Sequence, residues 1–410
     1  MAGTATTDLL IAASRLVPAT PGSGVLSPGY VLVSGGRVAE VGAGPPPRSA
    51  DIELAAGLLV PGFVDLQVNG YFGEEFAAAD AAGWGKIVSR LPETGTTAFL
   101  PTFITAPVDR LAASLRAAAA LQPGLPRGAR VLGMHVEGPF ISPLRRGAHN
   151  ADWITAPSRG AVQDLLAAGS GQIRLVTLAP ELDGAIAAIT QLTRAGVLVS
   201  VGHSDATAAQ VAAAADAGAR MVTHLFNGQR PLHHREPGVP GQALTDSRLT
   251  SGLIVDLQHV AAEVAMIAFT AAPGRICLVT DAAACAGMPP GRYLLGGEPI
   301  ELPPGDGVPP VRMDGTLAGS ALRMDAAVAN LVAAGAGLAD AIAAASRIPA
   351  DLIGRGDLGR IGPGSAADLV WLGDDMRTLA TWLDGDMVYS APEARRDDKP
   401  RIFRTGRSRT

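Results

Sequence analysis

The chain has 410 residues, of which 48% are hydrophobic, so it can bury a large core and is long enough for one large domain beside a smaller one. Its formal net charge is −5, from 33 basic and 38 acidic residues, which excludes a strong positive field for nucleic acid or an anionic membrane. Any anionic ligand must therefore be held by local groups.

Targeting and redox features favour a cytoplasmic protein. The two cysteines, Cys277 and Cys285, are too few for a disulfide framework. The N-terminus has no basic region before its short apolar run at 9–13, so no signal peptide is expected. Alanine-rich stretches such as 326–345 are interrupted by Asn, Asp and Gly, so no membrane-spanning segment is expected either.

The two ends of the chain share one pattern. Short β-rich runs, with Gly and Pro between them, occur before residue 62 and again between 367 and 390. We expect the two ends to meet in one small sheet domain, built from residues 1–60 and 362–392. Residues 393–410 mix seven basic with three acidic groups and few apolar ones, so a flexible basic tail is expected there.

The middle of the chain, residues 61–361, alternates apolar runs with alanine-rich stretches of roughly 10 to 15 residues, which is typical of repeated βα units. Eight strands are predicted near 63–69, 97–103, 130–137, 173–179, 197–203, 219–225, 252–258 and 276–281. Most of these runs are apolar on both faces, as in covered parallel sheets. They predict an α/β fold with a (β/α)8 TIM-like barrel, and no dinucleotide or P-loop motif supports a doubly wound sheet.

Polar residues end several predicted strands, where barrels of this kind carry out chemistry. The third, fifth and sixth strands end in Glu137, His203 and His224. A carboxylate with two imidazoles suits zinc and leaves a coordination position open for water. These three residues are therefore the predicted ligands of one divalent metal, with Zn²⁺ preferred and Fe²⁺, Mn²⁺ or Co²⁺ as alternatives.

The eighth strand ends in Asp281. A lone Asp at this place is commonly a helix N-cap, but beside a metal site it is the predicted general base. His135 lies two residues before Glu137 and therefore on the same strand face. We expect it deeper in the barrel, where it supports the ligands or packs.

Three further residues are candidates for substrate contacts. His149 and His259 lie outside the ligand set and can donate hydrogen bonds to a substrate, although isolated loop histidines are often surface residues. Arg235 lies in a loop after the predicted strand at 219–225, where a planar guanidinium suits a phosphate. A solvated loop cation would give the same pattern.

The first strand ends in amides. Asp65, Gln67 and Asn69 alternate along it and share one face, where many barrel hydrolases have a His-x-His metal clamp. Neutral amides are poor zinc ligands. We therefore expect these side chains to form hydrogen bonds in the site, as the remnant of a second metal position.

Five segments together resemble one known family. They are HVEGPFISPLRRGAHN at 135–150, SVGHSDAT at 200–207, THLFNGQRPLHHREPG at 223–238, LVTDA at 278–282 and GTLAGSAL at 315–322. In this order and spacing they resemble the N-acetylglucosamine-6-phosphate deacetylases of the amidohydrolase superfamily, from about residue 58 to residue 368. This resemblance also implies a small β-sandwich built from both chain ends.

The resemblance implies roles for individual residues. Glu137, His203 and His224 would hold the metal, and Asp281 would be the catalytic acid and base. The implied substrate contacts are Ala148, His149, Asn227, Gly228, Arg235, His259, Leu317, Ala318 and Gly319. In this family the arginine that matches Arg235 reaches the sugar phosphate of the neighbouring subunit, which implies a homodimer.

Four positions refine the comparison with this family. Some members carry His-x-His on the first strand and bind two metals, whereas Gln67 and Asn69 match the members that use one. Leu257 stands where the family usually has Gly, and Gly228 stands where Ala is common. Both lie near implied substrate contacts.

The reaction implied is metal-dependent hydrolysis of the acetamide of N-acetyl-D-glucosamine 6-phosphate, in amino-sugar catabolism or recycling, with His149 stabilising the developing oxyanion. A deacetylase for the galactose isomer stays open as an alternative. A cyclic amidase is less favoured because the predicted strand at 173–179 has no lysine to bridge two metals. A barrel that serves only as a scaffold is disfavoured because all four predicted metal-site and catalytic residues are present.

Overall fold

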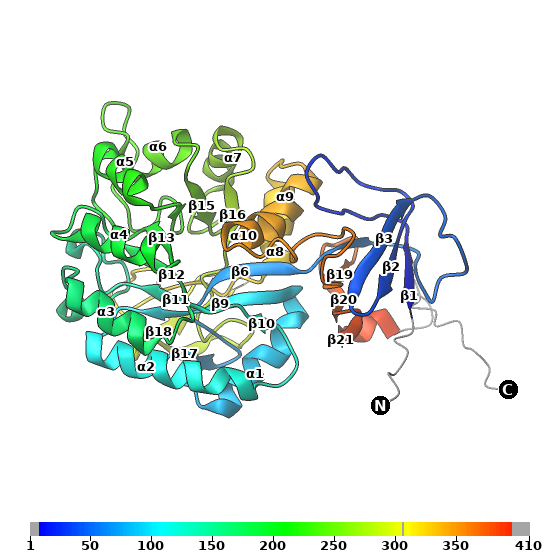
Figure 1. Ribbon diagram of the computed structural model, residues 1–410, viewed down its shortest axis with the longest axis horizontal. Coiled ribbons are helices and arrows are strands. Elements are labelled where there is room, and N and C mark those ends of the chain that lie inside the picture. Colours follow the sequence, from blue (N-terminus) through cyan, green and yellow to red (C-terminus); the bar gives the residue numbers. More distant parts are fainter. Residues whose placement is uncertain (1–7, 306, 396–410) are drawn as a thin grey trace.

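The computed structural model describes residues 8–305 and 307–395, and it confirms the predicted barrel (Figure 1). The barrel strands are β6 (Phe63–Val68), β9 (Thr96–Ile104), β11 (Met134–Glu137), β12 (Ile173–Leu178), β13 (Leu198–Val201), β14 (Met221–Val222), β15 (Thr250–Leu253) and β16 (Ile276–Leu278). All pair in parallel, in chain order. Their C-terminal ends therefore meet at one face of the barrel.

The barrel closes between its first and last strands through backbone contacts just beyond β16. The N–H of Asp281 donates to the carbonyl of Gln67 over 3.0 Å, and Val68 forms a parallel bridge with Ala282. The strand predicted at 130–137 is split into β10 (Arg130–Val131) and β11, because Gly133 breaks it with φ of 137°.

Helices pack around the barrel: α1 (Ala81–Arg90), α2 (Val108–Leu121), α3 (Arg159–Ala168), α4 (Ala185–Arg194), α5 (Ala208–Ala217), α6 (Gly238–Thr245), α7 (Ala262–Ala271), α8 (Met324–Ala333), α9 (Leu338–Ala345) and α10 (Arg347–Leu352). Local sequence fixes several starts. Asp80 caps α1 by accepting from the N–H groups of Ala82 and Gly83, and Thr207 forms a capping box with Gln210 at α5. Within the described residues, no helix is long and apolar enough to cross a membrane.

Both chain ends form the predicted small β-sandwich beside the barrel (Figure 1). One sheet holds β1 (Leu9–Ala13), β2 (Gly29–Ser34), β3 (Arg37–Ala43) and β4 (Ile52–Leu54), and the other holds β5 (Leu58–Pro61), β19 (Leu369–Leu372), β20 (Thr378–Leu383) and β21 (Asp386–Ser390). Residues far apart in the chain share its core, including Ile11, Leu59 and Trp382. Alternating burial along β2 reflects one covered face.

The predicted boundary of the C-terminal tail at residue 393 falls inside an ordered turn. Pro392–Arg395 form a 3-10 helix, and Ala394 is buried in the sandwich core. The remainder of the predicted tail, 396–410, lies outside the described residues. The other predicted domain boundaries remain predictions.

A hairpin that the sequence patterns did not reveal follows the last barrel strand. It consists of β17 (Gly291–Leu295) and β18 (Glu298–Leu302). Leu295 from this hairpin packs with Ile104, at the end of β9, in a small buried cluster above the barrel. A second small pair, β7 (Gly70–Tyr71) with β8 (Glu74–Glu75), follows β6. The hairpin and the loops beyond the strands thus build the surroundings of the barrel mouth.

Candidate metal and catalytic site

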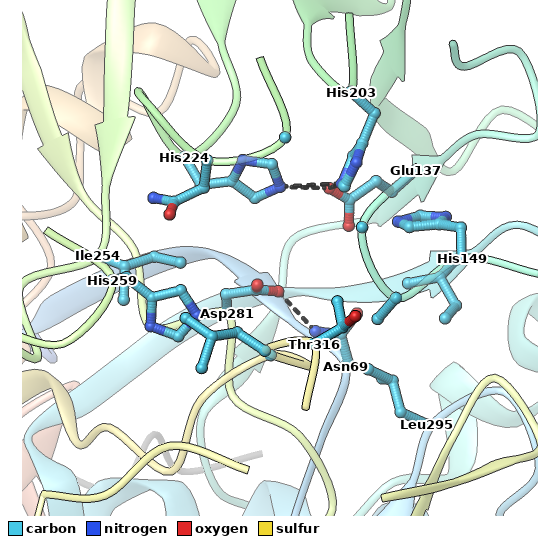
Figure 2. Close-up of a pocket in the computed structure, with 17 residues that line it drawn as sticks. Asn69, Glu137, His149, His203, His224, Ile254, His259, Asp281, Leu295 and Thr316 are labelled. Carbon is cyan, nitrogen blue, oxygen red and sulfur yellow. Dashed lines mark hydrogen bonds and ion pairs between the residues drawn. The ribbon is translucent and has the colours of Figure 1, made fainter. Parts of the chain in front are cut away.

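Three predicted site residues, each just after a barrel strand, have a left-handed backbone conformation. His203 has φ of 45°, His224 of 28° and Asp281 of 51°. Such angles are uncommon without glycine and cost on the order of 1–3 kcal/mol each. Figure 2 shows all three side chains converging on one cavity together with Glu137, the last residue of β11.

Glu137, His203 and His224 bring three ligand atoms to nearly one point. His224 Nε2 lies 3.0 Å from Glu137 Oε1 and 3.1 Å from His203 Nε2, and His203 Nε2 lies 3.3 Å from Glu137 Oε1. All three side chains are buried. Two imidazole nitrogens and a carboxylate oxygen this close would repel through their lone pairs without a proton or a cation between them.

This arrangement fits a tetrahedral metal ion. Bonds of about 2.0–2.2 Å at tetrahedral angles separate ligand atoms by roughly 3.3–3.6 Å, close to the distances found. His203 Nδ1 lies 2.9 Å from the carbonyl oxygen of Arg145, which can only accept. The His203 proton therefore sits on Nδ1 and Nε2 is free to bind a metal, which is the usual support for a ligand histidine.

Electrostatics also favour a cation among these groups. Burial alone would raise the pKa of Glu137, but its contacts with His203 and His224 hold that pKa well below the ordinary value. The carboxyl is therefore ionised within the buried cluster. A fixed negative charge beside two imidazoles is the donor set expected for zinc or a similar divalent ion.

His149 also lies close enough to Glu137 and His203 to form a metal-binding trio, with one atom from each within 4.8 Å of the others. Its hydrogen bonds argue for another role. His149 Nδ1 lies 2.7 Å from Thr105 Oγ1 and accepts from the Thr105 N–H over 3.4 Å. Burial lowers the pKa of His149 well below the ordinary value, so the ring is neutral and carries its proton on Nε2. A protonated Nε2 is a hydrogen-bond donor and cannot bind a metal.

Asp281 lies across the cavity from the metal-binding cluster, held by the two amides of the first strand. Asn69 Nδ2 donates to Asp281 Oδ1 over 2.7 Å, a contact drawn in Figure 2, and Gln67 Nε2 donates to the same oxygen over 3.0 Å. Gln67 Nε2 also lies 3.1 Å from Glu137 Oε2. One amide nitrogen thus lies between the two carboxylates.

Burial is the main cause of the raised pKa of the Asp281 carboxyl. Together with the charge of Glu137 it raises the pKa of Asp281 to about 6, although the Asn69 hydrogen bond opposes the shift. A carboxyl poised there can take up and release a proton near neutral pH. The environment therefore suits a general acid and base.

His135 is fully buried, consistent with the expectation that it lies deeper in the barrel, and Asp65 is buried as well. Thr280 Oγ1 donates to Asp65 Oδ2 over 2.6 Å, and burial raises the pKa of Asp65 to about 7. His135 Nε2 lies 2.8 Å from Thr177 Oγ1, and burial lowers the pKa of His135 to about 4. Neither residue lines the cavity.

Most predicted substrate contacts line this cavity: Ala148, His149, Asn227, Gly228, His259, Leu317 and Gly319. Ala318 is buried behind the wall in the small cluster under the hairpin. Gly228 has φ of 57°, and a Cβ there would lie 2.8 Å from His203 Nδ1. The chain therefore needs Gly, where the family commonly has Ala.

The cavity does not include Arg235. This residue lies in an exposed loop, 231–237, that follows β14, and its backbone N–H donates to His233 Nδ1 over 3.3 Å. Leu232 in the same loop is 52% exposed. The structure thus brings the metal and catalytic candidates together but leaves the predicted phosphate contact outside.

Five lining residues were missed by the sequence patterns: Ile104, Gly147, Ile254, Leu295 and Thr316. Gly147 and Thr316 are inside or beside the quoted motifs, so their neighbours Ala148 and Leu317 could have signalled them. Leu295 reaches the cavity only because the unpredicted hairpin folds over it. Thr105, which orients His149, follows a predicted strand end but carries no signal of its own.

Comparison with known proteins places this architecture in a family. The amidohydrolase family matches residues 58–388. The chain is 38% identical to the N-acetylglucosamine-6-phosphate deacetylase of Bos taurus, over 85% of this chain and 88% of the relative. It is 39% identical to the N-acetylgalactosamine-6-phosphate deacetylase of Escherichia coli O157:H7, over 82% of this chain and 89% of the relative.

A solved structure shows the same similarity in three dimensions. It is a variant of N-acetyl-D-glucosamine-6-phosphate deacetylase from Mycobacterium smegmatis in complex with N-acetyl-D-glucosamine-6-phosphate. The TM-score is 0.88 at 36% identity, over 94% of this chain and all of the other. The barrel, the sandwich and their arrangement are therefore shared.

Proposed function

This chain belongs to the amidohydrolase family, and we propose that it hydrolyses the acetamide of N-acetyl-D-glucosamine 6-phosphate. The products are acetate and D-glucosamine 6-phosphate, a step of amino-sugar catabolism or recycling. One observation carries the proposal: Glu137, His203 and His224 converge within 3.3 Å of one another, and Asp281 lines the same cavity.

The ligands of the metal ion are Glu137, His203 and His224. A bound divalent ion would supply a Lewis acid that polarises the amide carbonyl and lowers the pKa of water toward about 7. We propose one ion per chain, because Gln67 and Asn69 offer neutral amides that already hydrogen-bond to Asp281. Zn²⁺ suits two imidazoles and one carboxylate best, and Fe²⁺, Mn²⁺ or Co²⁺ can bind the same donors.

Asp281 moves the proton. Its ionised carboxylate removes a proton from the attacking water as the oxygen bonds to the amide carbon. The same carboxyl then gives that proton to the amide nitrogen, so that the C–N bond breaks and the amine leaves neutral. Gln67 and Asn69 keep the carboxylate in place through their hydrogen bonds.

His149 stabilises the negative charge that develops on the carbonyl oxygen. Because its Nδ1 accepts from Thr105, its Nε2 carries the proton that can be donated to an oxyanion. A donor fixed before the reaction needs little reorganisation, and losing one such donor typically costs on the order of 100- to 1000-fold in rate.

Substrate binding involves residues around the cavity and a second subunit. Asn227, Gly228 and His259 lie in the cavity wall, with Ala148, Leu317, Ala318 and Gly319 as further contacts or support. Arg235 supplies the phosphate contact. We propose that it does so in the neighbouring subunit of a homodimer, since its loop is exposed and lies outside its own cavity.

The galactose isomer is the second candidate substrate. The chain is 39% identical both to the human N-acetylglucosamine-6-phosphate deacetylase and to the bacterial galactosamine enzyme, so overall similarity does not separate them.

We propose the cytoplasm as the site of action, because the two cysteines are free and buried, as is usual in a reducing compartment.

Acetate release tests the proposal directly. The purified protein, loaded with Zn²⁺, would be offered N-acetylglucosamine 6-phosphate, its galactose isomer and unphosphorylated N-acetylglucosamine. We expect N-acetylglucosamine 6-phosphate to give the highest kcat/KM. A preference for the galactose isomer would support the second candidate, and no acetate from any of the three would overturn a deacetylase function.

A further inference from the structure

A buried Asp–His pair lies in the cavity wall beside the catalytic Asp281. His259 Nδ1 is 2.6 Å from Asp256 Oδ2, and the side chains of both residues are 6% exposed. His259 lines the cavity, whereas Asp256 does not and lines a second pocket instead. Neither the quoted motifs nor the proposed mechanism uses Asp256.

The chemistry of this contact fixes where the proton of His259 resides. A carboxylate can only accept, so the nitrogen facing it must carry hydrogen. Nδ1 is therefore protonated, and Nε2 is the one ring nitrogen left for the substrate. A histidine held in this way presents a defined atom in a defined direction, as in the ligand histidines of metal sites and in catalytic triads.

We propose that Asp256 is a positioning residue for substrate binding, which fixes the Nδ1–H tautomer and the ring orientation of His259. The inference rests on the proposed function, in which His259 contacts the substrate. In the Nδ1–H tautomer, Nε2 accepts a hydrogen bond from a sugar hydroxyl group, which corrects the expectation from the sequence that His259 donates one. Because Asp256 touches neither the substrate nor the reacting atoms, its loss should weaken binding and leave the hydrolytic step largely intact.

Asp256 has a second task that makes the test selective. Its Oδ1 accepts from the backbone N–H groups of Gln258 and His259 over 2.9 and 2.8 Å, which holds the turn after β15. Asp256→Asn can keep these two bonds through its carbonyl oxygen. Its amide nitrogen would then face His259 Nδ1 and, as a donor, would force the ring into the opposite tautomer.

The tautomer can be read without any substrate. In protein labelled with ¹⁵N-histidine, the His259 signals are identified by their absence from His259→Phe. We expect a protonated Nδ1 and an unprotonated Nε2 in the wild type, and the reverse in Asp256→Asn. A wild-type ring protonated on Nε2 alone would overturn the proposal, whether or not the protein is a deacetylase.

Kinetics with N-acetylglucosamine 6-phosphate separate positioning from general support of the fold. Asp256→Asn should raise KM roughly 2- to 12-fold, the range for one hydrogen bond between neutral groups at 1.4 kcal/mol per tenfold, with kcat largely unchanged. In the His259→Phe background the same change should add almost nothing, since the two residues act as one unit.

Two results would contradict this assignment. Additive losses in the double variant would show that Asp256 acts independently of His259. A fall in kcat at unchanged KM would place the pair in the chemical step. Equal Zn²⁺ content and unchanged unfolding midpoints in all variants are required as controls, and Asp256→Ala, which also loses the two backbone bonds, shows the effect of disturbing the turn itself.

Discussion

The predicted metal ligands and the predicted phosphate contact differ in burial. Glu137, His203 and His224 lie at the ends of barrel strands and are almost completely buried, whereas Arg235 lies on the exposed loop 231–237. Both His224 and this loop follow the same strand, β14. Hydrogen bonds fix the side chains on the catalytic side of the cavity. The Arg145 carbonyl accepts from His203, and the amides of Gln67 and Asn69 donate to Asp281. The tip of the loop is held by hydrogen bonds within the loop itself, between the backbones of His233 and Glu236.

The base of the loop is nevertheless fixed. Arg230 donates to Asp205 Oδ2 over 2.8 Å, and Arg145 donates to Asp205 Oδ1 over the same distance. In the proposed function, the hydrolytic residues all belong to one chain, while the phosphate contact is assigned to Arg235, which does not line the cavity of its own chain. Substitutions at Asp281 and Arg235 probe this contrast, and a pair of substitutions at Leu257 probes backbone strain.

The largest loss is expected at the rigid side, from Asp281→Asn. The amide is nearly isosteric but cannot take up a proton, so kcat should fall on the order of 100-fold or more while the metal stays bound. Measured kcat with metal analysis checks this. Near wild-type kcat would remove Asp281 from the mechanism.

The pH profile of the wild type sharpens the same assignment. Asp281 accepts a proton only when ionised, and burial raises its pKa to about 6, so activity should be present above that pH and lost as the pH falls through it. Since a bound cation stabilises the carboxylate, the acid limb should lie at or below about 6. The residual activity of Asp281→Asn should lack this limb.

A smaller and more selective loss is expected at the exposed loop. Arg235→Ala should lower kcat/KM for the 6-phosphate roughly 10- to 150-fold, from about 1.5–3 kcal/mol of charge-assisted bonding. Activity on the unphosphorylated sugar should scarcely change. Equal losses on both substrates would show that Arg235 supports structure instead.

Mixed dimers decide which subunit Arg235 serves. When Arg235→Ala chains are combined with Asp281→Asn chains, each heterodimer should regain one site that has an intact Asp281 and, from the other chain, an intact Arg235. Activity should therefore rise above that of either variant alone. No recovery in verified heterodimers would place the contact within a single chain.

The smallest expected effect is on stability and concerns backbone strain at Leu257, in the loop after β15. Leu257 has φ of 63° at a position where the related family usually has Gly. Leu257→Gly and Leu257→Ala both remove the side chain, but only Gly tolerates this angle, so the Gly variant should unfold with about 1 kcal/mol more free energy than the Ala variant. Urea unfolding measures the difference, and an Ala variant that is equally stable or more so would exclude strain here.

The sequence predicted which side chains converge at the end of the barrel because its signals there are local. Apolar runs located the strands, and Glu137, His203, His224 and Asp281 follow directly from where those runs end. The two chain ends carried strand patterns of their own, which was enough to predict one small sheet domain, while the sandwich arrangement was implied by the family resemblance. These features depend on burial and periodicity, which the residue types record.

What the sequence missed depends on contacts between distant segments. The hairpin that carries Leu295, at 291–302, joins two short strands across Gly296 and Gly297, and its pattern was too brief to recognise. Thr105 sets the proton position on His149, and Asp256 sets that on His259. Both contacts form only when the loops fold, so the sequence patterns did not reveal them. The exposure of Arg235 likewise follows from the path of its loop.

The central claim is a single catalytic metal held by Glu137, His203 and His224. After a chelator has removed all metal, Zn²⁺ would be added stepwise while acetate release from N-acetylglucosamine 6-phosphate is measured. We predict that activity rises linearly and reaches its plateau at one Zn²⁺ per chain, and that His203→Ala recovers neither metal nor activity. Full activity in the metal-free protein, or a plateau reached only at two Zn²⁺ per chain, would contradict the account.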